Sequence, residues 1–138
     1  MSTHFKLIIS LSLGLLTLFG WHFATVFGLL GTAPETQADF FIRIGFIILL
    51  FIVISVISSI LVAKKDENAI LPDEREEKIE LKTDRIGVTS LYIGLMIVMW
   101  FAFTPMAPMQ VANSILAVVC ITEIIKIAYG LFLLKRGV

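Results

Sequence analysis

Two charged residues, Glu123 and Lys126, stand inside the last long apolar run of the sequence. Three residues apart on a helix, they share one face. Each charge left alone at the centre of a bilayer would cost at least ~2.5–3.5 kcal/mol. We therefore expect an intrahelical ion pair that faces the interior of a helix bundle. Because ionisable residues inside a membrane mark candidate functional sites, this pair is the first place to look for chemistry.

Three further polar side chains could join the pair. At a rise of ~1.5 Å per residue, Tyr92 and Ser55 fall near the level of Lys126, and His22 falls roughly two turns from it, towards the outer side. A cluster of Glu123, Lys126, Tyr92, Ser55 and His22 could relay protons or hold a small ionic ligand. The alternative is structural, because a Glu–Lys pair neutralises itself and can serve packing specificity alone.

The sequence predicts that the protein is not an enzyme. It has no Ser/His/Asp set, no glycine-rich phosphate loop, and no His and Cys residues at metal-ligand spacing. Cys120 is the only cysteine, so we expect neither an intrachain disulfide nor paired-thiol chemistry within one chain. We expect no catalytic residue, no metal and no cofactor. The absence of a basic stripe argues against nucleic acid as a partner.

The elements that must position these residues are four long apolar runs. Hydrophobic residues make up 58% of the 138 residues, and the mean hydropathy is +0.97. A small water-soluble domain cannot bury that much apolar surface, whereas lipid can solvate it. In lipid every backbone group must be satisfied within its own segment, so the runs predict helices. We expect an all-α, single four-span membrane domain made of two hairpins, with spans at about 7–30, 40–63, 86–104 and 111–134.

The distribution of Lys and Arg predicts the orientation. Lys6, the charged segment 64–85 with six Lys/Arg, and the Lys135–Arg136 pair all carry positive charge, whereas the other two connections carry none. Positive residues favour the cytoplasmic side. We expect both termini in the cytoplasm and a multi-pass protein of the inner membrane. Arg43, near the start of the second span, is expected to form a local ion pair, with Asp39 four residues before it and Glu35 nearby.

The charged segment has its own predicted structure. Asp73, with Glu76 three residues later, resembles a capping box, and strong helix formers continue from there without a breaker. We expect one helix from about Asp73 to Thr104, part in water and part in lipid. Its charged half is either a solvated face or a docking surface for a protein partner, and both interpretations stay open. The candidate docking residues are Asp73, Glu74, Arg75 and Arg85.

The run from Leu71 to Gly87 resembles the signature of small uncharacterised prokaryotic membrane proteins grouped as domain of unknown function 2178. In these proteins an Asp-Glu-Arg stretch, an Ile and an Arg-Ile/Ala-Gly step lead into a membrane helix. The resemblance implies a four-helix membrane protein with a juxtamembrane helix, and it implies no activity. The matching residues are Asp73, Glu74, Arg75, Ile79, Arg85 and Gly87.

Two function classes follow. The first is an accessory, regulatory or immunity-type membrane protein that binds a membrane or cytoplasmic protein through 73–85. The second is a small homo-oligomeric transporter or channel that uses Glu123 and Lys126. Gly20, Ala24 and Gly28 form a small-xxx-small run, which lets membrane helices approach closely. We expect this run to pack within the chain, with a second copy as the alternative partner.

Overall fold

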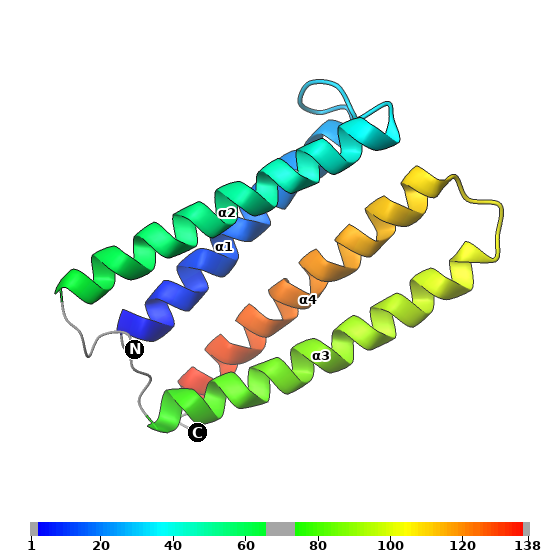
Figure 1. The fold of residues 1–138 in the computed structure, drawn as a ribbon. Coiled ribbons are helices and arrows are strands. Elements are labelled where there is room, and N and C mark those ends of the chain that lie inside the picture. Colours follow the sequence, from blue (N-terminus) through cyan, green and yellow to red (C-terminus); the bar gives the residue numbers. More distant parts are fainter. Residues whose placement is uncertain (1–2, 66–73, 137–138) are drawn as a thin grey trace. The chain divides into compact units, whose positions relative to one another are not determined.

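The computed structural model describes residues 3–65 and 74–136, and these form four α-helices (Figure 1). All four helices are long and apolar enough to cross a bilayer, since a span needs ~20 apolar residues. The predicted all-α class is thereby confirmed, and the described residues contain four helices that could serve as spans. The helices are α1 (Thr3–Val26), α2 (Gln37–Lys65), α3 (Glu74–Ala102) and α4 (Pro108–Arg136).

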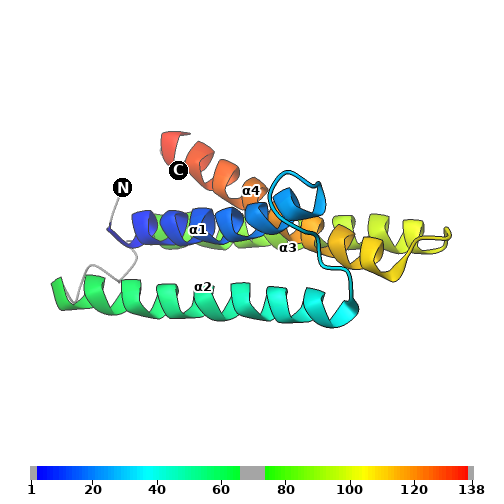
Figure 2. The same ribbon diagram turned by 90° about the horizontal axis from the view of Figure 1, so that it is seen from above.

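The chain divides into two units, residues 1–72 and 73–138, and each is a helical hairpin. In the first, α1 and α2 run antiparallel on either side of the connection 27–36 (Figure 1). In the second, α3 and α4 run antiparallel on either side of the short connection 103–107, and α4 is inclined to α3 in the view of Figure 2.

Helix α1 ends earlier than the apolar run predicts, because Gly28 stops it. Gly28 has a φ of +72°, a conformation that L side chains rarely adopt. Its N–H donates to the carbonyl of Thr25 at 3.0 Å, and the N–H of Leu29 donates to the carbonyl of Ala24 at 2.8 Å. These two bonds define a Schellman motif. The predicted span 7–30 was therefore wrong at its end, and Gly28 closes the helix instead of extending a small-residue stripe.

Helix α2 begins with a reciprocal cap. The hydroxyl of Thr36 accepts from the N–H of Asp39 at 3.1 Å, and Asp39 Oδ2 accepts from the N–H and the hydroxyl of Thr36 at 3.3 and 2.6 Å. This arrangement satisfies helix N–H groups that would otherwise lack a partner, and the carboxylate suits the positive end of the helix dipole.

Helix α3 is continuous from the charged residues into the apolar ones, as predicted. Its buried residues, Glu76, Ile79, Thr83 and Gly87, are spaced three or four apart and occupy one side of the helix. The predicted N-cap, Asp73, lies outside the described residues.

Glycines let α3 and α4 approach closely at two points. A Cβ at residue 94 would stand 2.5 Å from Val118 Cγ1, and a Cβ at residue 87 would stand 2.6 Å from Lys126 Cδ. Residues 87 and 94 are a heptad apart, so both face α4. In contrast, a Cβ at Gly20 would meet nothing within 4 Å. Among the described helices, the close approach through glycine therefore occurs in the second hairpin and not along α1.

Candidate functional site: an ionic cluster between α3 and α4

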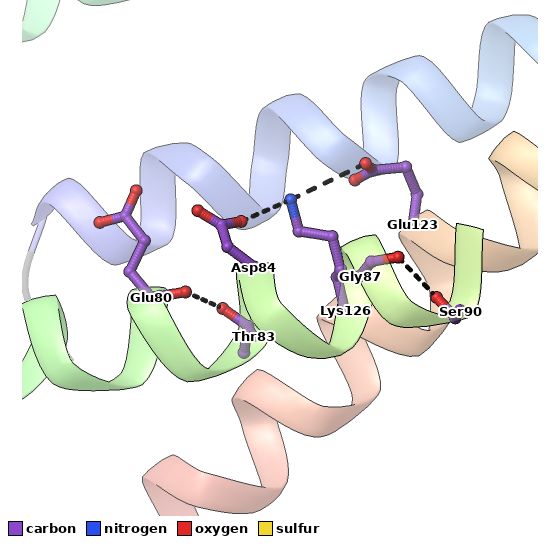
Figure 3. A network of polar contacts seen from close by, with 7 residues as sticks. All are labelled: Glu80, Thr83, Asp84, Gly87, Ser90, Glu123 and Lys126. Atoms are coloured by element: carbon purple, nitrogen blue, oxygen red, sulfur yellow. Dashed lines mark hydrogen bonds and ion pairs between the residues drawn. The ribbon is translucent and has the colours of Figure 1, made fainter. Parts of the chain in front are cut away.

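Lys126, on the buried side of α4, is the centre of an ionic cluster. Its Nζ lies 2.8 Å from Asp84 Oδ1 of α3 and 4.0 Å from Glu123 Oε1, one turn earlier on α4 (Figure 3). The expected Glu123–Lys126 pair is thus present, but the closer partner is Asp84, which the sequence interpretation missed. The Lys126 ammonium therefore joins α4 to α3 through Asp84 and also pairs with Glu123 of its own helix.

The aliphatic part of Lys126 reaches Asp84 by crossing Gly87. The space that a Cβ of residue 87 would fill is occupied by Cδ and Cγ of Lys126. Two hydroxyl groups of α3 nearby are satisfied within their own helix, since Thr83 donates to the carbonyl of Glu80 at 2.8 Å and Ser90 to that of Gly87 at 2.9 Å (Figure 3). A side chain at 87 would therefore displace the stem of Lys126 from its present path to Asp84.

The register of the hairpin bears on the depth of this cluster. Arg75 donates to the carbonyl of Leu134 at 3.1 Å, so the charged half of α3 lies beside the last ten residues of α4. If 111–134 were all in hydrocarbon, the charges between 75 and 85 would be carried in with it, at ~2.5–3.5 kcal/mol for each Arg, Lys or Asp. The lengths 86–102 and 108–125, the second of which contains the single charged residue Glu123, are ~26 Å, close to the ~30 Å of a hydrocarbon core. If a hydrocarbon core covered these two lengths, Lys126 would lie at its boundary and Glu123 one turn inside it.

The remaining residues of the predicted polar site, Tyr92, His22 and Ser55, do not belong to the ionic cluster around Lys126. Tyr92 is on α3, ~12 Å along the helix from Asp84, and its side chain is 66% exposed. The structure does not bring it to Lys126. His22 and Ser55 belong to the other hairpin. His22 is fully buried beside the ring of Phe40, 5.6 Å between centroids. The hydroxyl of Ser55 is buried and has no hydrogen-bond partner within the described part of the chain.

The predicted docking residues also divide. Glu74, Arg75 and Arg85 are all exposed on α3. Arg75 in addition donates to the carbonyl of Leu134 near the end of α4, and Asp73 lies outside the described residues. The side of α3 opposite the buried one carries residues that we call the charged stripe. Its members are Glu74, Glu77, Lys78, Leu81, Lys82 and Arg85, all exposed.

Arg43 has partners other than the expected Asp39. Its Nη1 donates to the hydroxyl of Thr25 at 2.6 Å, its Nη2 donates to the carbonyl of Thr32 at 3.0 Å, and its guanidinium lies 5.4 Å from the ring centre of Trp21. The helix cap takes up one oxygen of the Asp39 carboxylate, Oδ2. The predicted ion pair with Asp39 was wrong, because the guanidinium of Arg43 is directed to Thr25 and Thr32 while the cap holds Asp39 at the start of α2. Arg43 instead ties α1, the connection and α2 together.

The chemistry open to the ionic cluster is limited. Lys126 is neutralised by carboxylates of its own chain, so the cluster holds two helices together without a ligand. No group of three or more His, Cys, Asp or Glu residues in 3–65 and 74–136 could hold a metal ion.

Comparison of the chain with protein-family models, with curated proteins and with solved structures finds no match. The resemblance to domain of unknown function 2178 stays a prediction. Two of the residues that carry it have definite roles in the hairpin: Ile79 is fully buried, and Gly87 lies under Lys126.

Proposed function

We propose that this chain is an accessory, regulatory or immunity-type protein that binds another protein at the cytoplasmic face of a prokaryotic inner membrane. The observation that carries the proposal is the charged stripe of α3. Lys6, the six Lys/Arg of 64–85 and the Lys135–Arg136 pair favour that side for both termini. The proposed surface would then face the cytoplasm.

The charged stripe has two features of a contact surface. Its charges are graded, with Glu74 and Glu77 far from the apolar half of α3 and Lys82 and Arg85 next to it. Leu81, at its centre, is 65% exposed although it lies ~7 Å beyond the first apolar residue of the span. A partner with an apolar side chain opposite Leu81, acidic groups near the membrane and basic groups further out would complement it.

The same gradient argues against a second copy as the partner on this surface. Two copies inserted in the same direction would bring their α3 helices together in parallel. Glu74 and Glu77 would then face their own counterparts, as would Lys82 and Arg85, and like charges at an interface are unfavourable. A different protein, with the opposite gradient, is therefore the better occupant.

A photocrosslinking side chain at Leu81, introduced into the full-length protein in cells, tests this proposal. We expect one heteromeric adduct of defined mass, which disappears when Lys82→Glu and Arg85→Glu are added. Val88 is the matched control, because it is exposed two turns along the same side of α3 but within the apolar half. Adducts equal at both positions, or an adduct of the chain with itself alone, would contradict the proposal.

The alternative is a small homo-oligomeric transporter or channel that uses Glu123 and Lys126. It has less support because Asp84 and Glu123 neutralise Lys126 within one hairpin. In a transporter, Glu123→Gln would abolish flux in proteoliposomes and leave the amount of folded protein unchanged. A structural role predicts the reverse, with no flux to lose and a lower thermal stability.

A further inference from the structure

The first hairpin contains a hollow of about 500 Å³ where the connection 27–36 meets the start of α2. Ligand sites in proteins are commonly ~300–1,000 Å³, so this hollow is large enough for a small group. Polar and apolar side chains of both the connection and α2 share its walls. They are formed by Trp21, Thr32, Ala33, Pro34, Glu35, Asp39, Ile42, Arg43 and Phe46.

Arg43 is the cation of this hollow, and it is held in place before any ligand arrives. The hydroxyl of Thr25, the carbonyl of Thr32 and the ring of Trp21 fix its guanidinium. A guanidinium has five N–H donors, and these two hydrogen bonds use one donor on each terminal nitrogen. The remaining donors retain the planar geometry that suits a phosphate oxygen.

The position of Arg43 along α2 matches the phosphate level of a bilayer. Residues 44–63 contain no charge, and at ~1.5 Å per residue they span ~30 Å, the thickness of a hydrocarbon core. Arg43 and Lys64 therefore mark its two boundaries. Trp21, which stacks on Arg43, belongs to a residue type enriched at this interface.

The acidic residues decide which headgroup fits. Glu35 and Asp39 line the same hollow as Arg43, so two carboxylates oppose one cation and a net anionic headgroup is disfavoured. A zwitterionic headgroup that carries a primary ammonium matches both signs. Ile42 and Phe46 continue from Asp39 along the same side of α2, where they offer an apolar path to an acyl chain.

We propose that this hollow binds a phospholipid of the phosphatidylethanolamine type. The phosphodiester would accept from Arg43, and the ammonium would donate to Glu35 and Asp39. The acyl chains would start along Ile42 and Phe46. This inference is independent of the proposed protein partner, because the charged stripe is on the other hairpin.

Native mass spectrometry of the full-length protein in mild detergent tests the assignment, with phosphatidylethanolamine, phosphatidylcholine and phosphatidylglycerol of identical acyl chains. We expect the ethanolamine lipid to give the most adduct. Glu35→Gln should lower the ethanolamine-to-glycerol lipid ratio about threefold, the effect of one exposed ion pair. Arg43→Gln should reduce binding of both lipids, whereas Lys64→Gln, at the other end of α2, should change neither.

Three results would overturn the proposal. One is equal binding of the three lipids by the unaltered protein. Another is a lipid ratio unchanged in Glu35→Gln, a variant of an exposed connection residue that keeps the helices intact even if Arg43→Gln fails to fold. The third is displacement of the ethanolamine lipid by equimolar phosphoethanolamine or inorganic phosphate, which would assign the site to a soluble ligand.

Discussion

The aliphatic stem of Lys126 lies across Gly87, so that a Cβ on residue 87 would stand 2.6 Å from Lys126 Cδ and 2.8 Å from its Cγ. The ammonium beyond that stem lies 2.8 Å from Asp84, one turn earlier on α3. A residue without a side chain and a residue with a long one thus form one contact. The ion pair and the close approach of the two helices depend on each other.

Gly87→Ala is expected to lower the free energy of unfolding in detergent by about 1–2 kcal/mol, because overpacking costs more than the better helix propensity of Ala returns. Lys126 would have to leave its position over residue 87 and lengthen its contact with Asp84. Gly45→Ala is the matched control, since a Cβ there meets nothing within 4 Å. It should be neutral or stabilising by up to about 1 kcal/mol. Equal effects of the two substitutions would contradict the packing described for Gly87.

Asp84→Asn should destabilise the hairpin more than Glu123→Gln, because Asp84 is the nearer partner of Lys126. Both effects should be at most about 1 kcal/mol, since these side chains are partly exposed and solvent screens the pairs. The double exchange Asp84→Lys with Lys126→Glu should recover most of the stability lost in Lys126→Glu alone. Thermal unfolding of the four variants in one detergent measures this. A larger effect for Glu123→Gln would show that the main partner of Lys126 is on its own helix.

How far the sequence predicts this site depends on the kind of information each residue carries. Glu123 and Lys126 stand out because they interrupt an apolar run, and their spacing alone places them on one face. Asp84 does not stand out, since it is one of eight acidic residues in 64–85. Its pairing follows from the register of α3 against α4, which is a tertiary property. The heptad spacing of Gly87 and Gly94 and the short connection before α4 are the sequence signals that indicate this register.

The helices themselves were predictable because apolar length is a property of each segment alone. The end of α1 was not predicted, since Leu29 and Leu30 continue the apolar run beyond the residue that stops the helix. A glycine at position 28 is a typical helix-ending residue, but its spacing from Gly20 and Ala24 is equally typical of a stripe of small residues that packs against another helix. The partners of Arg43 were not predicted from the sequence either, because Thr25 and Thr32 lie outside its own helix.

Gly28→Ala is expected to cost about 1–2 kcal/mol, because a side chain at a φ of +72° is strained. Gly28→Asn should cost less, since Asn tolerates this conformation better than Ala. Gly20→Ala, within the helix and with nothing within 4 Å of the added Cβ, should not destabilise. Unfolding measurements on the three variants separate the two roles of Gly28. The opposite result would be a loss of stability in Gly20→Ala together with a greater loss in Gly28→Asn than in Gly28→Ala. It would show that Gly20, Ala24 and Gly28 form a helix-packing surface, as the sequence pattern predicts.

The depth of the ionic cluster gives the last prediction, and cysteine labelling in lipid nanodiscs checks it. In a Cys120→Ser background, Phe132→Cys lies ~9 Å beyond Lys126 and Ile121→Cys lies ~8 Å before it. Both parent side chains are about half exposed, so burial within the protein does not separate them. If Lys126 marks the membrane boundary, a charged maleimide should label residue 132 quickly and residue 121 slowly, whereas in denaturing detergent both should react alike. Equal protection of the two cysteines in nanodiscs would mean that 111–134 lies wholly in hydrocarbon. The charged half of α3 would then have to separate from α4 in the bilayer, because the register set by Arg75 and Leu134 would otherwise draw its charges into lipid.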